Sequence, residues 1–230
     1  MNAKPLNLLR LAGANIRYKA LPSSFNVGLL ALSVAFILMI VHLNDQIDRR
    51  FTKDLAGIDL VVSGKGSPLQ IILANVFHLD IPTGNIPADE AQKLAHHPMV
   101  KSAIPLALGD NYNGYRIVGT TPDYITHYTA SLETGRIFKA PMEIVLGSEV
   151  AAQFKLNVDD SLVGAHGLVN SADLHADFPY KVVGILKPTG GVIDRLVLTE
   201  IDSVWHVHEH PDADDPDEVA YKADHPWKEI

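Results

Sequence analysis

Residues 25–43 read FNVGLLALSVAFILMIVHL, and the rest of the chain is organised around this stretch. No charged residue occurs between Lys19 and Asp45. An α-helix needs about 20 apolar residues to cross the roughly 30 Å hydrocarbon core of a bilayer, where it satisfies its own backbone polar groups. A core helix of a soluble domain would show a polar stripe at helical spacing, and none is visible. The stretch therefore predicts a transmembrane helix, which one soluble domain follows.

A cleaved signal peptide is the alternative for the same stretch. Such peptides have a short basic start, an apolar core of about 7–15 residues and small residues at the cleavage site. Here the lead and the apolar run are longer, and VHLN at residues 41–44 offers no such site, which favours an uncleaved anchor. Because basic residues accumulate on the cytoplasmic side of a span, the N-terminus is expected in the cytoplasm. The basic residues before the span are Lys4, Arg10, Arg17 and Lys19, and those after it are Arg49, Arg50 and Lys53.

Composition excludes several classes of site. The 230 residues include no cysteine, so disulfides, thiolate zinc sites and cysteine nucleophiles are excluded. The formal net charge of −8 comes from one end, because residues 200–230 hold ten acidic residues and two lysines. The rest of the chain is close to neutral, which argues against nucleic-acid binding.

The segments on either side of the span also have periodic patterns. Residues 5–20 are amphipathic and basic, which is typical of a helix on a membrane surface, and Pro22 is expected to break the path before the span. Apolar residues about one helical turn apart predict that the helix continues as a stalk over residues 44–56. Residues 58–63 are rich in β-branched side chains and predict a strand.

The remaining domain alternates short strands with short helices. Helices are predicted over residues 87–97 and 147–154, the second with Ser148 as its N-cap. Asn113-Gly114 is a strong hairpin signal. The expected fold class is α+β, with mixed or antiparallel sheets and short helices, on a single N-terminal transmembrane helix. The predicted strands are residues 100–108, 115–120, 144–146, 162–168, 180–186 and 195–198.

Several stretches carry a family resemblance. They are LRLAGANIRYKALPSSFNVGLLALSVAFILMIV at residues 9–41, EIVLGSEVAAQFKLNVDDSL at 143–162 and FPYKVVGILKPTGGVIDRLVLTEIDSVW at 178–205. Together they resemble the FtsX-like and MacB-like permease family of ABC transporters, and the last two, in this order, are the most specific. DLVVSGKGSPLQIILANVFHLDIPTGNIP at residues 59–87 is similar to one branch of that family.

The resemblance implies a domain organisation. It implies three further spans after the domain, a separate cytoplasmic ATPase subunit and a permease homodimer. This sequence shows no second apolar run of spanning length after Trp205, so it resembles the N-terminal portion of such a permease. The implied parts are a cytoplasmic amphipathic leader (1–24), a transmembrane helix (25–43), a stalk helix (44–57), a MacB-like periplasmic core domain (58–205) and an acidic, His-containing tail (206–230).

The tail supplies the candidate metal ligands. His206, His208 and His210 alternate among acidic residues, and imidazole with carboxylate side chains binds zinc or copper. The alternative is a solvated acidic tail without a metal.

Catalysis and nucleotide binding are not expected of this chain. A phosphate loop has the pattern G-x-x-x-x-G-K-[ST]. GKGS at residues 64–67 departs from it, because Lys65 is followed by Gly66 where Ser or Thr is needed, and Asp59 stands where the first glycine belongs. Neither G-x-S-x-G nor H-E-x-x-H occurs. No enzyme activity and no cofactor are therefore expected in the chain itself, and ATP is expected to act through a partner subunit.

The expected function is that of an ABC-transporter permease subunit in the bacterial inner membrane. ATP hydrolysis by the partner would move the periplasmic domain for export or extraction of a substrate. Arg10 and Arg17 are the expected contact with the ATPase, because arginines pair well with carboxylates. Membrane lipid is a further expected partner, and nucleic acid is not. The alternative is a single-pass, membrane-anchored periplasmic binding or sensor domain without transport.

Overall fold

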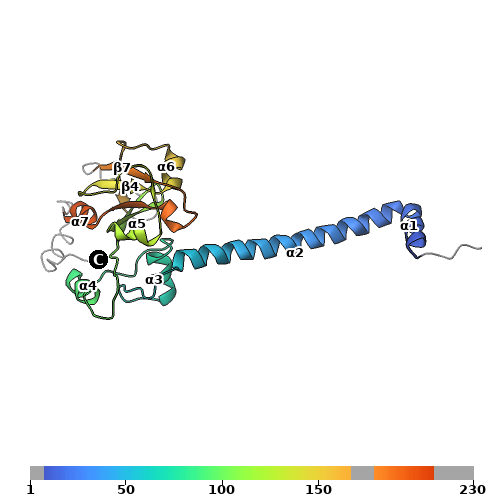
Figure 1. Ribbon diagram of the computed structural model, residues 1–230, viewed down its shortest axis with the longest axis horizontal. Helices are drawn as coiled ribbons and strands as arrows, with labels where there is room; N and C mark the ends of the chain where they lie inside the picture. Colours follow the sequence, from blue (N-terminus) through green and yellow to red (C-terminus); the bar gives the residue numbers. More distant parts are fainter. Residues whose placement is uncertain (1–7, 167–178, 210–230) are drawn as a thin grey trace, which may run out of the picture. The chain divides into compact units, whose positions relative to one another are not determined.

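The computed structural model describes residues 8–166 and 179–209. The chain divides into two compact units between Phe51 and Thr52 (Figure 1). We call the unit that begins at Thr52 the head. The head therefore includes the last residues of the long helix α2.

Two helices make up the described part of the N-terminal unit, α1 (Leu8–Tyr18) and α2 (Ala20–Leu55). With 36 residues, α2 is about 54 Å long. Among the described residues it is the one helix that is long and apolar enough to cross a membrane. The predicted span and stalk thus lie on one continuous helix. Pro22 does not break it, because a proline is tolerated in the first turn, and the interruption falls at Lys19 instead.

In the part of the head that the structure describes, eight strands form one mixed sheet, which confirms the expected fold class. The strand order is β3-β7-β4-β8-β2-β1-β6, with β5 paired to β7. Strand β8 runs parallel to β2 and antiparallel to β4, and β4 runs parallel to β7. The strands are β1 (Ala107–Tyr112), β2 (Tyr115–Thr120), β3 (Leu132–Gly135), β4 (Glu143–Leu146), β5 (Ser161–Leu162), β6 (Ala165–His166), β7 (Tyr180–Leu186) and β8 (Val197–Glu200).

Side chains alternate between the two faces of the sheet, and both faces are covered. One buried cluster contains Ile117, Ile144 and Val182 and packs with helix α6 (Ser148–Phe154). Their neighbours along the strands belong to a second cluster with helix α5 (Asp123–His127) and the 3₁₀ helix η1 (Val192–Arg195). A sheet covered on both faces buries consecutive residues along a strand, as at residues 116–120 of β2 and 144–146 of β4.

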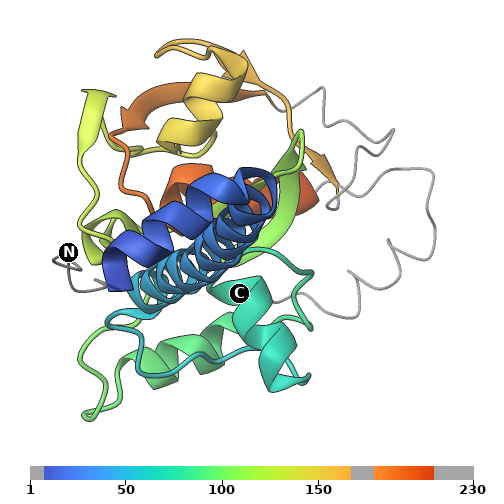
Figure 2. The ribbon, with the colours of Figure 1, turned by 90° about the vertical axis from the view of Figure 1, so that its right-hand side faces the viewer.

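Three other helices lie among the described residues of the head. Helices α3 (Pro68–Asn75) and α4 (Ala88–Ala95) lie at the end of the head opposite α6 (Figures 1 and 2). Helix α7 (Ile201–Glu209) follows β8 directly and contacts β1, β2 and β8.

The predicted hairpin at Asn113-Gly114 is confirmed. Asn113 has φ 49° and Gly114 has φ 86°, the backbone that a two-residue hairpin turn requires. The predictions for residues 115–120 and 180–186 agree with β2 and β7. Strand β1 begins only at Ala107, however, and Arg195 lies in η1.

Two local predictions were wrong. Residues 58–63 form no strand, because no neighbouring strand takes their backbone groups. Ser148 is not the N-cap of α6; the cap is Gly147, whose backbone is extended at φ −63° and ψ 151°.

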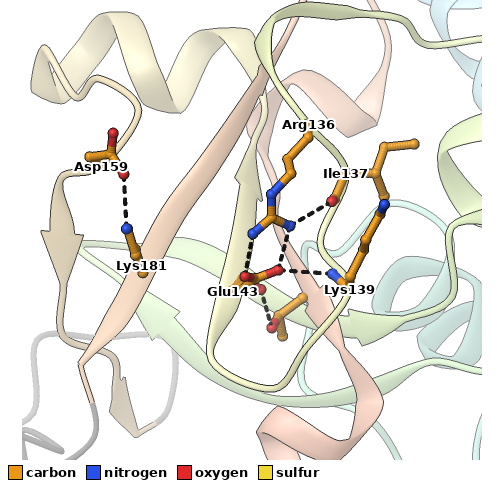
Figure 3. A network of polar contacts seen from close by, with 7 residues as sticks. Arg136, Ile137, Lys139, Glu143, Asp159 and Lys181 are labelled. Carbon is orange, nitrogen blue, oxygen red and sulfur yellow. Dashed lines mark hydrogen bonds and ion pairs between the residues drawn. The ribbon is translucent and has the colours of Figure 1, made fainter.

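A bidentate ion pair connects the end of β3 to the start of β4 (Figure 3). Arg136 Nη1 donates to Glu143 Oε2 at 2.7 Å, and Nη2 donates to Oε1. The Lys139 amide donates to the same carboxylate at 2.9 Å. These bonds, chiefly those from Arg136, lower the pKa of Glu143 from 4.5 to about 2. Figure 3 also shows the separate exposed pair of Lys181 with Asp159 at 2.9 Å.

Glu143→Gln is expected to lower the free energy of unfolding at pH 7 by no more than about 1 kcal/mol, since solvent screens this pair. The folded-state pKa is lowered, so the stabilisation is fully present above pH 4.5 and is lost as the pH falls towards about 2. Urea titrations in detergent near neutral and near pH 3 measure this. An equal difference between wild type and variant at both pH values would contradict the assignment. Lys181→Gln, which removes an exposed pair, is the control and should change little.

Candidate functional site

Within the head, the last turn of α2 is bonded to the loop between β7 and η1. Asp54 is only 8% exposed, and its Oδ1 accepts a hydrogen bond from the Val192 amide at 2.9 Å. The neighbouring Lys53 Nζ donates to the Thr189 carbonyl. The first amides of a helix have no partner within it, so a carboxylate there satisfies a donor and suits the helix dipole. Two adjacent side chains of α2 thus bind one short loop, one at Thr189 in its middle and the other at Val192, where η1 begins.

The glycines of this loop allow the close approach of Asp54. A Cβ atom at Gly191 would lie 2.8 Å from Asp54 Oδ1, closer than real Cβ atoms come. Gly190 has φ +74°, a left-handed conformation that glycine adopts without strain. A larger residue at position 191 would therefore displace the carboxylate of Asp54.

Asp194 holds the loop in one conformation. Its carboxylate is 7% exposed and accepts hydrogen bonds from the Thr189 amide at 2.9 and 3.0 Å, and from the Gly190 amide at 2.6 Å. The Thr189 hydroxyl donates to it at 2.9 Å. The loop is thus closed on itself by a buried carboxylate. We call Lys53, Asp54 and residues 189–194 the joint.

The joint continues into the sheet through Gly147. A Cβ atom there would lie 2.4 Å from the carbonyl oxygens of Ile193 and Asp194. The Gly147 amide donates to the Leu196 carbonyl at 2.9 Å. Gly147 lies between β4 and α6, so these contacts connect η1 to the start of α6 and the end of β4.

A chain of aromatic and polar groups extends from the other side of α2. The Tyr128 hydroxyl donates to the Asp54 carbonyl at 3.4 Å, and the Tyr128 ring lies 5.0 Å from that of Tyr124. The Tyr124 hydroxyl lies 2.8 Å from His78 Nε2. Burial raises the pKa of both tyrosines. Burial and the charge of Arg116 lower the pKa of His78 to about 3, so all three groups are neutral at physiological pH.

The structure places the arginines that the sequence singled out on one helix. Arg10 and Arg17 both lie in α1, seven positions apart and therefore about two helical turns apart. The Arg17 side chain is exposed. Their contact with an ATPase stays a prediction.

The predicted metal ligands lie at the edge of the described chain. His206 and His208 are in α7. His210 lies outside the described residues. Within residues 8–166 and 179–209, no group of three potential ligands is placed to hold a metal ion. Metal binding by the tail stays a prediction.

Sequence reasoning missed the residues of the joint. It treated PTGG at residues 188–191 only as a break between strands. The available signal was a pair of glycines followed by Asp194, a pattern typical of a tight loop closed by a carboxylate. Nothing local indicated Asp54, which bonds to a residue 138 positions later.

Comparisons with known proteins identify the family of the chain. A family model described as the MacB-like periplasmic core domain matches residues 23–224. The periplasmic region of MacB from Actinobacillus actinomycetemcomitans is 15% identical, with a TM-score of 0.39, over 60% of this chain and 71% of that one. The extracellular domain of the noncanonic ABC-type transporter YknZ from Gram-positive bacteria is 13% identical, with a TM-score of 0.40, over 71% and 92%. No curated protein matches the chain.

Proposed function

Because the chain belongs to the family of the MacB-like periplasmic core domain, we propose that it is a permease subunit of an ABC transporter. In this proposal α2 spans the bacterial inner membrane, with the N-terminus in the cytoplasm and the head in the periplasm. A separate ATPase subunit binds on the cytoplasmic side, and two copies of the permease pair. ATP hydrolysis moves α2, and the head changes its conformation to export or extract a substrate.

The joint is the observation that carries the proposal. A sensor or binding domain that only needs an anchor is served by a flexible linker. Here the last turn of the candidate span is bonded to the head through the buried Asp54, and the loop that receives it is itself closed by Asp194. A helix fixed in this way transmits displacement, because packed elements move as rigid bodies.

The orientation is tested by reporter fusions after Lys101, which follows α2, α3 and α4. A reporter active only in the periplasm should be active there, and one active only in the cytoplasm should be inactive, because basic residues precede the span. Fusions after Lys19, before the span, are the matched control and should give the opposite result. Activity of the cytoplasmic reporter after Lys101 would exclude a periplasmic head.

Arg10→Glu together with Arg17→Glu is expected to weaken co-purification of the ATPase subunit and to lower transport-linked ATP hydrolysis. The reason is that charge reversal replaces attraction to carboxylates of the partner with repulsion. Arg49→Glu with Arg50→Glu, beyond the apolar stretch of α2, is the matched control. Wild-type association and hydrolysis in the α1 variant would show that α1 is not the contact.

A further inference from the structure

We propose that the side chains of His78 and Tyr124 form a latch that holds residues 63–84 against the rest of the head at neutral pH and releases them in mildly acidic solution. We call residues 63–84 the α3 segment. The inference goes beyond the proposed function, because it concerns a conformational change within the head that needs neither an ATPase nor a second copy. It assigns a role to buried groups that the joint does not use.

The α3 segment is closed on itself by bonds between its two ends. The Thr83 hydroxyl donates to the Gly64 carbonyl at 2.8 Å, and the Gly64 amide donates to the Gly84 carbonyl at 3.3 Å. A Cβ atom at Gly66 would lie 2.3 Å from Thr83 Cγ2, so the two ends cross in close contact. A segment closed in this way can open as one cooperative unit.

The attachment of the segment to the rest of the head is less extensive. Within the described chain, α3 packs extensively against no strand of the sheet. The turn after α3 is bonded to two other elements. His78 Nε2 lies 2.8 Å from the Tyr124 hydroxyl of α5, and Arg116 of β2 donates from Nη2 to the Asp80 carbonyl at 2.6 Å. Regions with few contacts to their surroundings open at a fraction of the free energy of global unfolding.

The site of His78 fits a neutral imidazole. The residue is 6% exposed, and its φ of 54° lies in the left-handed region that residues other than glycine seldom adopt. Nδ1 is buried and has no hydrogen-bond partner among the described residues. In a neutral ring this nitrogen can remain an unprotonated acceptor while Nε2 bonds to Tyr124. The surrounding structure thus holds His78 in a constrained conformation that opening relieves.

Protonation would break this fit. A protonated imidazole donates from both nitrogens, so Nδ1 would become a buried donor without an acceptor. The new positive charge would also face Arg116, which is 3% exposed. Burial, and then the charge of Arg116, lower the pKa of His78 to about 3. Uptake of a proton near pH 5 therefore requires that His78 leave its site.

The neighbouring titratable groups do not offset this effect. Arg116 acts on His78 directly and disfavours its protonated form, and burial raises the pKa of Tyr124, which stays neutral. The carboxylates nearby act on Arg116 and Tyr124 instead. The groups around the latch are Tyr124 and Tyr128 at α5, Arg116 of β2, Asp110 of β1, Asp80 in the turn of His78 and Asp54 at the end of α2.

The size of the effect follows from the pKa of His78 in the two states. In the open segment the imidazole is solvated and has its ordinary pKa of 6.5. Because burial lowers the pKa in the closed segment, the stabilisation of the closed state is fully present above pH 6.5 and is lost as the pH falls towards 3. The ratio of open to closed segment at pH 5 should be about 30 times that at pH 7.5.

The test measures opening in the full chain in detergent. Because the chain has no cysteine, single Cys variants report on one position each. The reaction rate with 4,4′-dithiodipyridine, a thiol reagent that reacts in mild acid, is divided by the rate at an exposed position. The variants are Ala74→Cys and Val76→Cys at buried positions of the α3 segment, Val150→Cys at a buried position of α6, and the exposed reference Ser102→Cys.

We expect the normalised rates at positions 74 and 76 to rise about 30-fold between pH 7.5 and pH 5, and the rate at 150 to stay low. His78→Gln keeps a neutral hydrogen-bonding group but takes up no proton, so it should abolish the rise. His97→Gln, at an exposed histidine after α4, is the matched control and should keep it. Tyr124→Phe removes one bond of the latch and should raise the rate about fivefold at pH 7.5.

Several results would overturn the inference. Equal normalised rates at pH 7.5 and pH 5 would show that acid does not release the segment, and a full rise in His78→Gln would show that another group responds. An equal rise at position 150 would show that acid unfolds the whole head. An unchanged rate in Tyr124→Phe at pH 7.5 would show that its hydroxyl does not hold the segment. None of these results bears on the span or the joint, on which the proposed function depends.

Discussion

Asp54→Ala is expected to uncouple transport from ATP hydrolysis in a transporter assembled with its ATPase subunit. The variant loses the hydrogen bond to the Val192 amide and leaves that buried donor without a partner. Such a loss costs about 1–3 kcal/mol, which corresponds to a shift of about 5-fold to 150-fold in the equilibrium between a bound and a released joint. We therefore expect transport to fall about tenfold, while ATP hydrolysis stays near the wild-type rate.

Gly191→Val tests the same contact without removing the carboxylate. Its Cβ atom would come within 2.8 Å of Asp54 Oδ1 and force the two apart, so the same loss of transport is expected. Asp48→Ala, at an exposed position of α2, and Gly28→Ala, where nothing lies within 4 Å of the new Cβ atom, are the controls. Transport at the wild-type rate in both joint variants would show that force does not pass through the joint.

Leu146→Ala is expected to have the largest effect on the stability of the head. Leu146 is fully buried in the central strand β4, and truncation of such a leucine costs about 2–5 kcal/mol through lost burial and the cavity left behind. Chemical denaturation in detergent measures the loss.

Leu69→Ala is the matched control for Leu146→Ala, since the same atoms are removed from a side chain that is 66% exposed. It should change the free energy of unfolding by no more than about 0.5 kcal/mol. Similar losses in both variants would show that Leu69 packs in a core.

Local patterns determined much of this protein. The uncharged run at residues 25–43 determined the long apolar helix, because helical backbone bonds are local and need no partner elsewhere. Asn113-Gly114 determined its hairpin, since glycine and asparagine adopt the positive φ angles of such a turn. Residues 180–186 are rich in β-branched side chains, and this composition indicated β7, because such side chains suit a strand that is covered on both faces.

Only the tertiary structure decided the other features, because each of them depends on residues that are far away in the sequence. Residues 58–63 look like a strand but have no strand beside them, and the Gly64 amide next to them bonds to Gly84. Gly147 replaces Ser148 as the cap of α6, because the carbonyls of Ile193 and Asp194 leave no room for a side chain there. Asp54 looks like one more charge on an exposed helix, yet folding buries it against Val192. A buried carboxylate needs a donor close by, and long-range packing alone brings that donor to it.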